Sequence, residues 1–381
     1  MRSAGDMAGA AGRSISPADR ISFAGAGAGA ACGTLFGVTA VVLLVNPVSG
    51  RGLGARAARL AADRLRARGI EPRVLTGGSP EEMRRLASAA VRERPGALAV
   101  VGGDGTLSLI LDEVLGSGVP IALVPAGTGN DLARALGIPV GSAEDAASAI
   151  ELVATGGTRT IDVGEVWEAA DECDGPGSGS GAEHGPETGP DPSPASGRRT
   201  RFLTVCAIGL DARVADRTNR LRWPSGRLRY FLALAIELLR LSPLPFELRL
   251  DGGETESRPG ILLAVGNTRS YGGGIPMCPG ADPADGLLDV THVAPIGLVR
   301  LLRIFPLLLQ ARHAERPEAT LLRAREIEVG APGLVAYADG ERVGEGRVRI
   351  RLAAQRLEVF AGTGPAAGPA AGPATPARQR Q

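Results

Sequence analysis

In the first part of the chain, short apolar runs alternate with segments in which apolar residues recur every three to four positions. The runs are typical of buried strands, and the periodic segments are typical of helices. The runs fill residues 39–45, 97–101 and 120–124, and a further strand is predicted at 71–75. Strands that alternate with helices in this way predict an α/β domain with a doubly wound parallel sheet.

The pattern changes after residue 156. A helix is predicted over 142–155, and from residue 159 onward apolar and polar residues alternate, which is typical of antiparallel strands. We expect such strands at 202–208, 246–250, 260–265, 288–293, 326–329, 335–338 and 348–352. The sequence therefore predicts two domains. The first is the α/β domain over residues 38–156, and the second is an antiparallel β-sandwich over 157–352, after which 353–362 returns to the first domain as a strand.

Three segments lack apolar periodicity and are predicted to be disordered. They are the Gly/Ala-rich leader 1–37, the acidic Gly/Pro/Ser-rich insertion 170–199 and the Gly/Pro/Ala-rich tail 363–381. The uncharged stretch 21–45 is interpreted as part of the leader followed by a strand. It is not interpreted as a membrane anchor, because its first part is a Gly-Ala repeat of low hydrophobicity.

The composition excludes several classes of protein. Lys and Arg number 42 against 41 Asp and Glu, and this balance argues against binding of nucleic acid by a basic surface. The chain contains no lysine. That absence excludes a Walker A loop, the strand lysine of protein kinases and a Schiff-base mechanism, because each needs an amine. The four cysteines are scattered and predict neither a zinc site nor a disulfide framework.

The segment 102–106, Gly-Gly-Asp-Gly-Thr, joins a predicted strand to a predicted helix. Glycines let the backbone approach an anion, and the N–H groups at the start of a helix point at it, so the turn suits a phosphate. Asp104 would repel phosphate unless a divalent cation or a water mediates the contact. The alternative is a tight turn with a capping Asp. Because parallel strands end at one edge of a sheet, Asn46, Ser49, Thr76 and Thr128 are expected beside this turn.

Six motifs resemble those of the diacylglycerol/sphingosine-type lipid kinases, in the same order and at similar spacing. They are Asn46-Pro47-x-Ser49-Gly50, the 102–106 turn, Pro125-x-Gly127-Thr128-x-Asn130-Asp131, Gly272-Gly273-Gly274, Asp285-Gly286-Leu287-Leu288-Asp289 and Asp339-Gly340-Glu341. The 102–106 turn alone would also fit NAD kinases and, loosely, phosphofructokinases. The resemblance implies ATP bound between the two domains and transfer of its γ-phosphoryl group to a lipid hydroxyl. Diacylglycerol, giving phosphatidic acid, is preferred as acceptor, and sphingoid bases and phosphatidylglycerol stay open.

The resemblance also implies roles for single residues. Asp104 and Asp131 would organise water and Mg²⁺ near the phosphates, and Asp339 and Glu341 would activate the acceptor hydroxyl. Asp285, with the carbonyl oxygens of Asp282 and Leu287, resembles a magnesium site. The ATP cradle would comprise Asn46, Pro47, Val48, Ser49, Gly50, Thr76, Gly102, Gly103, Gly105, Thr106, Gly127, Thr128, Asn130 and Asp131.

The chain departs from the family's pattern at Ser108-Leu109, where Asn-Glu is common, and this change is expected to remove a polar contact near the nucleotide. Two alternatives stay open. A kinase resembling NAD kinase would phosphorylate a dinucleotide and need no vesicle. An inactive nucleotide-binding module would bind ATP without transferring phosphate.

Two segments combine apolar residues with arginines, 228–241 and 298–313. Basic amphipathic helices of this kind can lie in a lipid interface, and neither is long enough to span a bilayer. The alternative is that both pack on the β-sandwich with their arginines outward. We expect a cytoplasmic protein with peripheral contact to the inner membrane face and no nucleic-acid partner. Whether the protein forms a homodimer is left open.

Overall fold

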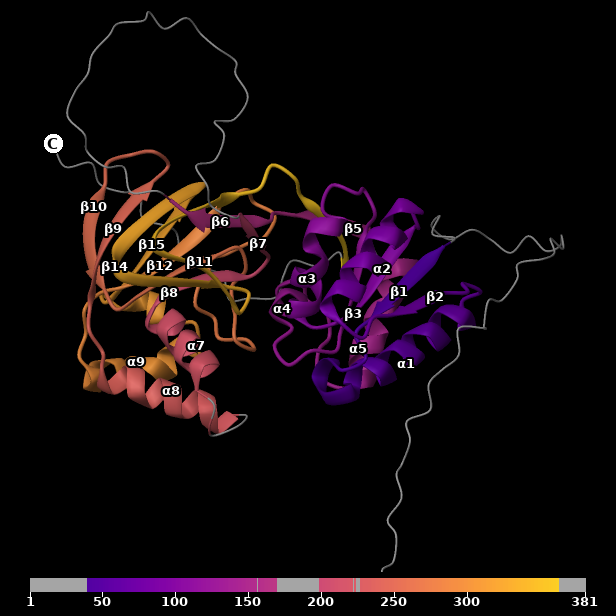
Figure 1. Cartoon of the computed structure of the whole chain (residues 1–381), viewed down its shortest axis with the longest axis horizontal. Coiled ribbons are helices and arrows are strands. Elements are labelled where there is room, and N and C mark those ends of the chain that lie inside the picture. Colours follow the sequence, from indigo (N-terminus) through magenta and orange to yellow (C-terminus); the bar gives the residue numbers. More distant parts are fainter. Residues whose placement is uncertain (1–39, 156, 170–198, 222, 224–226, 363–381) are drawn as a thin grey trace, which may run out of the picture. The chain divides into compact units, whose positions relative to one another are not determined.

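The computed structural model describes residues 40–155, 157–169, 199–221, 223 and 227–362 (Figure 1). The segments predicted to be disordered, 1–37, 170–199 and 363–381, lie outside the described residues, apart from Arg199. The remaining residues form the two predicted classes of sheet, and the predicted fold class is confirmed.

The first sheet has six strands in the order β2-β1-β3-β4-β16-β5. The strands from β2 to β16 pair in parallel, and β5 pairs antiparallel to β16. Strand β16 follows the second domain in sequence and joins the sheet beside β4. The strands are β1 (Val41–Val45), β2 (Arg73–Thr76), β3 (Ala97–Gly102), β4 (Ile121–Pro125), β5 (Gly157–Ile161) and β16 (Leu357–Ala361).

Helices cover both faces of this sheet, because alternate side chains of each buried strand point to opposite sides. Val42 and Leu44 of β1 pack with α2 and α3, whereas Leu43 packs with α1 and α5. Helix α2 begins with Ser79 as cap, whose hydroxyl accepts the Glu82 N–H at 3.2 Å, and with Pro80 in its first turn. The helical segments are η1 (Ser49–Gly52), α1 (Leu53–Ala67), α2 (Pro80–Arg92), α3 (Asp104–Val114), α4 (Asp131–Ala135), α5 (Ala143–Ser148), η2 (Ala149–Glu151) and α6 (Leu152–Thr155).

The second sheet is antiparallel and has ten strands. Its long strand β14 pairs with β9 through residues 327–330 and with β8 through 336–338, and its register shifts between the two stretches. The strands share one apolar core, which includes Phe202, Phe246 and Ile350. They are β6 (Gly164–Glu168), β7 (Thr200–Phe202), β8 (Val205–Gly209), β9 (Leu244–Leu250), β10 (Glu256–Gly260), β11 (Leu262–Gly266), β12 (Leu288–Val293), β13 (Ala319–Ala324), β14 (Glu326–Ala338) and β15 (Glu341–Leu352).

Several boundaries differ from the sequence prediction. The strand predicted at 202–208 is divided into β7 and β8, because the backbone N–H groups of Leu203 and Thr204 bond to the Asp339 carboxylate instead of to a neighbouring strand. The strands predicted at 326–329 and 335–338 form one strand, β14.

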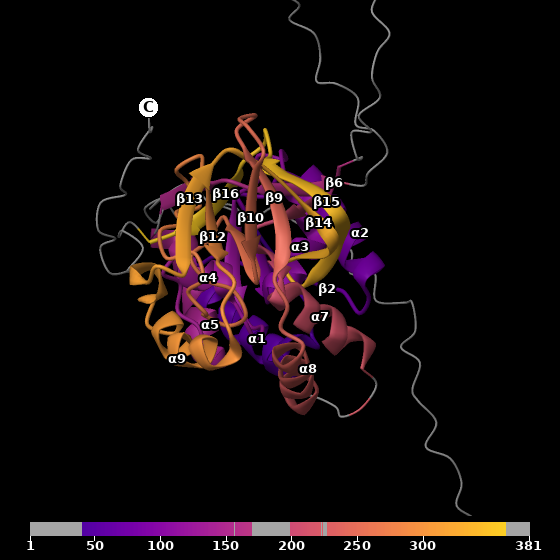
Figure 2. The same cartoon turned by 90° about the vertical axis from the view of Figure 1, so that its left-hand side faces the viewer.

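Three longer helices belong to the second domain: α7 (Leu210–Arg220), α8 (Arg227–Leu239) and α9 (Leu298–Leu308). The sequence analysis indicated α8 and α9, but it did not predict α7. Figures 1 and 2 both show α8 and α9 at the same end of the second sheet. None of the described helices is both long enough and apolar enough to cross a membrane. The second domain also contains the 3-10 turn η3 (His313–Glu315).

Candidate active site

The glycine turn between β3 and α3 contains glycines with two different structural roles. A Cβ atom on Gly102 would lie 2.4 Å from the Thr106 hydroxyl oxygen, and one on Gly103 would lie 2.8 Å from the Gly127 Cα atom. These two glycines are therefore required by packing inside the protein. Gly105, in the first turn of α3, is exposed, and a Cβ atom there would meet nothing within 4 Å. The free space at the helix start thus lies over Gly105, where a phosphate could approach the N–H groups.

The loops after β1, β3 and β4 are bonded to one another at this edge of the sheet. The Asn46 side-chain amide donates to the Thr106 hydroxyl oxygen at 3.1 Å, and the Ser49 hydroxyl donates to the Ala126 carbonyl oxygen at 3.2 Å. Gly50 has a positive φ of 56°, and a Cβ atom there would lie 2.2 Å from the same carbonyl oxygen. The structure therefore brings these loops together as the sequence predicts.

Not every predicted cradle residue offers a free polar group. Asn130 is buried, and its side chain closes its own turn by accepting the Gly127 N–H at 2.9 Å and donating back to the Gly127 carbonyl. Thr76 and Thr128 are exposed. Pro47 and Val48 form the turn after β1, where the Val48 N–H donates to the Asn46 side-chain oxygen at 3.3 Å.

Asp104 is half-buried, and each of its carboxylate oxygens accepts a backbone N–H from the start of α4. The donors are Asp131 at 2.9 Å and Leu132 at 3.2 Å. Burial raises the pKa of Asp104, and the neighbouring carboxylates of Asp131 and Asp339 add to the rise, although the two backbone bonds oppose it. Asp104 thus lies near two further carboxylates at the 102–106 turn, and such a grouping of negative charge attracts cations.

Asp131 joins the first domain to the second. Its carboxylate accepts the N–H groups of Gly273 at 2.9 Å and Gly274 at 2.7 Å, and the Ser270 hydroxyl donates to it at 3.3 Å. The three consecutive glycines at 272–274 all have positive φ, between 65° and 104°, a region that other residues rarely adopt. The Gly-Gly-Gly motif is therefore explained as a loop that wraps around the Asp131 carboxylate.

The Asp339-Gly340 pair forms the two-residue turn between β14 and β15, with φ angles of 47° and 88°. Positive φ at both central positions is typical of a tight hairpin turn, and Asp-Gly suits it. Asp339 points inward, whereas Glu341 begins β15 and is exposed. The backbone of Glu341 pairs with Ala338, but its side chain forms no hydrogen bond or ion pair with another described residue. The two carboxylates of the motif therefore face different surroundings.

The Asp339 carboxylate accepts four hydrogen bonds. Its donors are the Ser108 hydroxyl at 2.9 Å, the Leu203 N–H at 2.8 Å, and the N–H, at 3.0 Å, and hydroxyl of Thr204. Burial raises its pKa, and these bonds counteract the rise. Ser108 thus bonds α3 to the Asp339-Gly340 turn, and the expected loss of a polar contact near the nucleotide stays a prediction. The sequence offered no signal for Leu203 and Thr204, which carry no motif.

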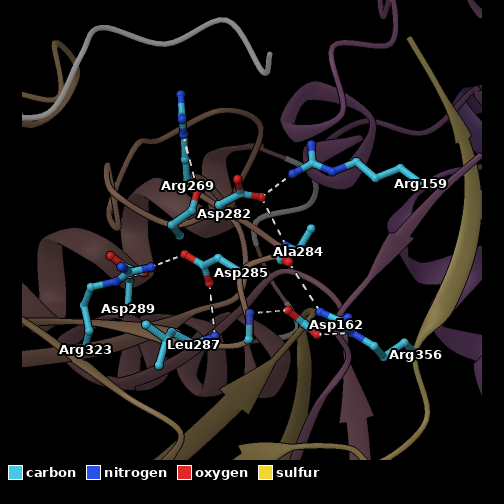
Figure 3. A network of polar contacts seen from close by, with 12 residues as sticks. Arg159, Asp162, Arg269, Asp282, Ala284, Asp285, Leu287, Asp289, Arg323 and Arg356 are labelled. Carbon is cyan, nitrogen blue, oxygen red and sulfur yellow. Dashed lines mark hydrogen bonds and ion pairs between the residues drawn. The ribbon is translucent and has the colours of Figure 1, made fainter. Parts of the chain in front are cut away.

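The predicted magnesium-binding residues lie on one turn before β12 (Figure 3). One oxygen of Asp285 accepts the Leu287 N–H at 3.0 Å, and the other bonds to the Arg323 guanidinium, which also bonds to Asp289 at 3.2 Å. The carbonyl oxygen of Asp282 accepts the Asp285 N–H at 3.3 Å. Burial raises the pKa of Asp289 to about 6, despite Arg323. In this arrangement the cation beside Asp285 is an arginine, and metal binding there stays a prediction.

One ion pair connects this turn to the first sheet, and a second joins the residues next to β5 and β16 of that sheet. Sequence reasoning missed both. Arg159 of β5 bonds to Asp282, and Arg356, just before β16, bonds to Asp162 at 2.6 Å (Figure 3). Asp162 in turn accepts the Gly286 N–H at 2.9 Å. No spacing pattern could have found these pairs, because their partners lie more than a hundred residues apart in the chain.

Comparisons with known proteins identify the families that this chain resembles. Residues 40–166 match the family described as the diacylglycerol kinase catalytic domain, and residues 204–361 match the YegS C-terminal NAD kinase beta sandwich-like domain. A protein of Mycobacterium tuberculosis (strain ATCC 25618 / H37Rv) named diacylglycerol kinase is 40% identical over 301 residues, covering 79% of this chain and 88% of that protein.

A more distant relative and a solved structure also match over most of their length. A diacylglycerol kinase of Bacillus subtilis (strain 168) is 25% identical over 289 residues, which cover 75% of this chain and 84% of that protein. The crystal structure of a putative diacylglycerol kinase from Bacillus anthracis str. Sterne superimposes with a TM-score of 0.61 at 20% identity, covering 85% of this chain and 98% of that one. This likeness concerns the fold.

Proposed function

The chain belongs to the diacylglycerol kinase family of lipid kinases, and we propose that it transfers the γ-phosphoryl group of ATP to the free hydroxyl of diacylglycerol, giving phosphatidic acid and ADP. The family supports phosphoryl transfer from ATP to a lipid, and the name carried by the relatives supports diacylglycerol as the acceptor. The Pro125–Asp131 and Asp285–Asp289 motifs argue against the NAD-kinase alternative.

The observation that carries this proposal is the bond between Ser108 and Asp339. Ser108 lies in α3, one turn after the Gly105 face where a phosphate could bind, and Asp339 lies in the turn that carries Glu341. The bond therefore holds a carboxylate of the second domain beside the phosphate-binding turn of the first. A kinase needs this juxtaposition, because the acceptor hydroxyl must meet the γ-phosphorus in line with the leaving oxygen.

Asp104 suits a role toward Mg²⁺. Its carboxylate is partly exposed, lies beside two further carboxylates and keeps free lone pairs after accepting two N–H bonds. When bound, Mg²⁺ neutralises charge on the phosphates of ATP. The described residues contain no group of three or more His, Cys, Asp or Glu side chains placed to hold a metal ion. The remaining ligands of the ion would therefore be phosphate oxygens and water, as is usual for Mg²⁺.

We assign proton transfer to Glu341 and positioning to Asp339. In the transfer step, the lipid hydroxyl oxygen forms a bond to the γ-phosphorus while the bond from that phosphorus to the bridging oxygen of ADP breaks. The hydroxyl proton passes to the Glu341 carboxylate, which is exposed and not bonded to another described residue. Asp339 accepts four hydrogen bonds already, so it holds the turn and is not placed to take the proton.

The direct test uses the full chain with γ-labelled ATP and Mg²⁺. Mixed micelles should contain diacylglycerol, phosphatidylglycerol or a sphingoid base, and a parallel reaction should contain NAD. We expect label in phosphatidic acid. Label in another lipid would correct the acceptor, and label in NAD or in no product would contradict the proposal.

Asp104→Ala should abolish this transfer, because the carboxylate that faces the metal and the phosphates is gone. Asp63→Ala is the matched control, since Asp63 is an exposed carboxylate on α1 that pairs with Arg66. Near-normal turnover by Asp104→Ala would remove this residue from the mechanism.

A further inference from the structure

Exposed apolar side chains gather on one part of the described structure. Twelve large hydrophobic residues are exposed in the whole of the described structure, and nine of them lie on α8, on α9 or just beside these helices. They are Trp223, Leu228, Tyr230, Leu232, Leu239, Val299, Leu302, Phe305 and Leu309. Single exposed apolar residues are ordinary, but a concentration of this kind marks an interaction surface.

Helix α9 contains nine apolar residues and two arginines in eleven positions, yet none of its residues is buried. Leu301 and Leu308 pack partly against the second domain and hold the helix in place. The residues that are exposed follow one another at spacings of three or four positions: Val299, Leu302, Phe305 and Leu309. Such spacing defines one stripe along a helix, so α9 presents a continuous apolar stripe to its surroundings.

Helix α8 presents a similar stripe. Leu228, Leu232, Ala235 and Leu239 are exposed at spacings of four, three and four, and Leu239 is 80% exposed. The opposite side, with Leu234 and Leu238, packs on a cluster that Leu301 of α9 also joins. The two helices are therefore neighbours, and both figures place them at one end of the second sheet (Figure 2).

Arg300 of α9 is paired with Glu318, and the described charges on these two helices that have no ion-pair partner are positive. Arg240, just after α8, and Arg303 of α9 are exposed, and neither forms an ion pair with another described residue. Helix α9 contains no acidic residue, and Glu237 of α8 is buried and paired with Arg217. Apolar stripes flanked by unpaired arginines fit the interface of a bilayer that contains anionic lipid, in which the side chains insert and the guanidinium groups meet phosphate.

We propose that α8 and α9 form a docking surface for an anionic bilayer, which brings the kinase to its lipid substrate. This inference rests on the proposed function, because a lipid acceptor gives the surface its occupant. An apolar stripe alone would also suit a second copy of the chain. The one-sided positive charge favours the bilayer, because two such surfaces would repel each other across a symmetric interface.

The test measures flotation of the full chain with phosphatidylcholine vesicles, with and without phosphatidylglycerol. Wild type should float with the mixed vesicles. Leu302→Ser combined with Phe305→Ser should weaken binding to them by about tenfold or more, because two inserting side chains are lost. Arg240→Gln combined with Arg303→Gln should weaken binding by roughly tenfold, and only where phosphatidylglycerol is present.

The matched controls are Val74→Ser and Leu321→Ser, since both residues are comparably exposed, at 45% and 43%, and lie on β2 and β13. They should float like wild type. Equal flotation of all variants, or no flotation of wild type, would overturn the proposal. A wild-type dimer in sedimentation velocity that the Leu302/Phe305 variant converts to monomer would assign the surface to a second copy instead.

A second readout separates this surface from the kinase assignment. The surface variants should phosphorylate a short-chain, water-soluble diacylglycerol at the wild-type rate, because their substitutions lie outside the catalytic residues. A chain that floats but phosphorylates no lipid would contradict the proposed function and leave the surface standing. A chain that phosphorylates the soluble substrate but never floats would contradict the surface alone.

Discussion

Substitution of Gly105 by alanine tests whether the phosphates of ATP approach the start of α3. The position has ordinary helical geometry, is exposed, and leaves an added methyl group without any protein neighbour within 4 Å. Alanine is favoured over glycine within a helix by about 0.5–1 kcal/mol. The fold should therefore become slightly more stable, with the melting temperature unchanged or raised by roughly 1–3 °C.

The same methyl group should harm nucleotide binding. It would occupy the open space in which a phosphate reaches the N–H groups of the turn, and displacement of the phosphate would weaken at least one charge-assisted hydrogen bond. Such a bond contributes about 1.5–3 kcal/mol, which corresponds to a rise in the KM for ATP of roughly ten- to hundredfold. Stability and nucleotide affinity should therefore change in opposite directions.

Gly103→Ala is the informative comparison. Its Cβ atom would lie 2.8 Å from the Gly127 Cα atom, so the two loops must separate and the fold should lose about 1–3 kcal/mol. Thermal unfolding gives the stability of each variant, and ATP titrations at saturating lipid give the KM of each for ATP. Gly105→Ala with a wild-type KM for ATP would refute the placement of the phosphates over this residue.

Three further predictions concern single carboxylates. Glu341→Gln should lower kcat by about 10²–10⁴ while the KM for ATP stays near wild type, because only the proton acceptor is lost; an unaltered kcat would remove Glu341 from catalysis. Asp339→Ala should lower the free energy of unfolding by about 2–4 kcal/mol in urea titrations, since two N–H groups and two hydroxyls lose their acceptor; a wild-type unfolding midpoint would argue against this role. Burial raises the pKa of Asp211, which accepts a bond from the Tyr271 hydroxyl, from 3.8 to about 7. Folding therefore takes up a proton between these pH values, and the free energy of unfolding should fall as the pH rises from about 4 to about 7. Asp211→Asn should flatten this fall in urea titrations across the range, and an identical pH profile would contradict it.

The two classes of sheet could be predicted because they follow from local patterns. Short apolar runs that alternate with helical periodicity, followed by period-two segments, determine which elements form. Parallel strands must end at one edge, so the convergence of the loops at Asn46, Ser49 and 102–106 needed no further information. Where an element was missed, as with α7, its polar, arginine-containing sequence offered few apolar residues to reveal a helix.

The roles of the site residues depended on contacts between distant parts of the chain. The sequence marked the glycines of the 102–106 turn alike, but only packing separates Gly103, confined by Gly127, from Gly105, which faces free space. The sequence also assigned Asp339 and Glu341 to one catalytic motif. In the structure, hydrogen-bond donors from α3 and from the turn after β7 enclose the Asp339 carboxylate. These donors lie more than a hundred residues away from it in the chain, so no local pattern encodes them. The sequence thus determined which chemical groups reach the edge of the sheet. Tertiary packing decided which of these groups remain free to react, because a carboxylate that already accepts four hydrogen bonds has no lone pair left to take a proton.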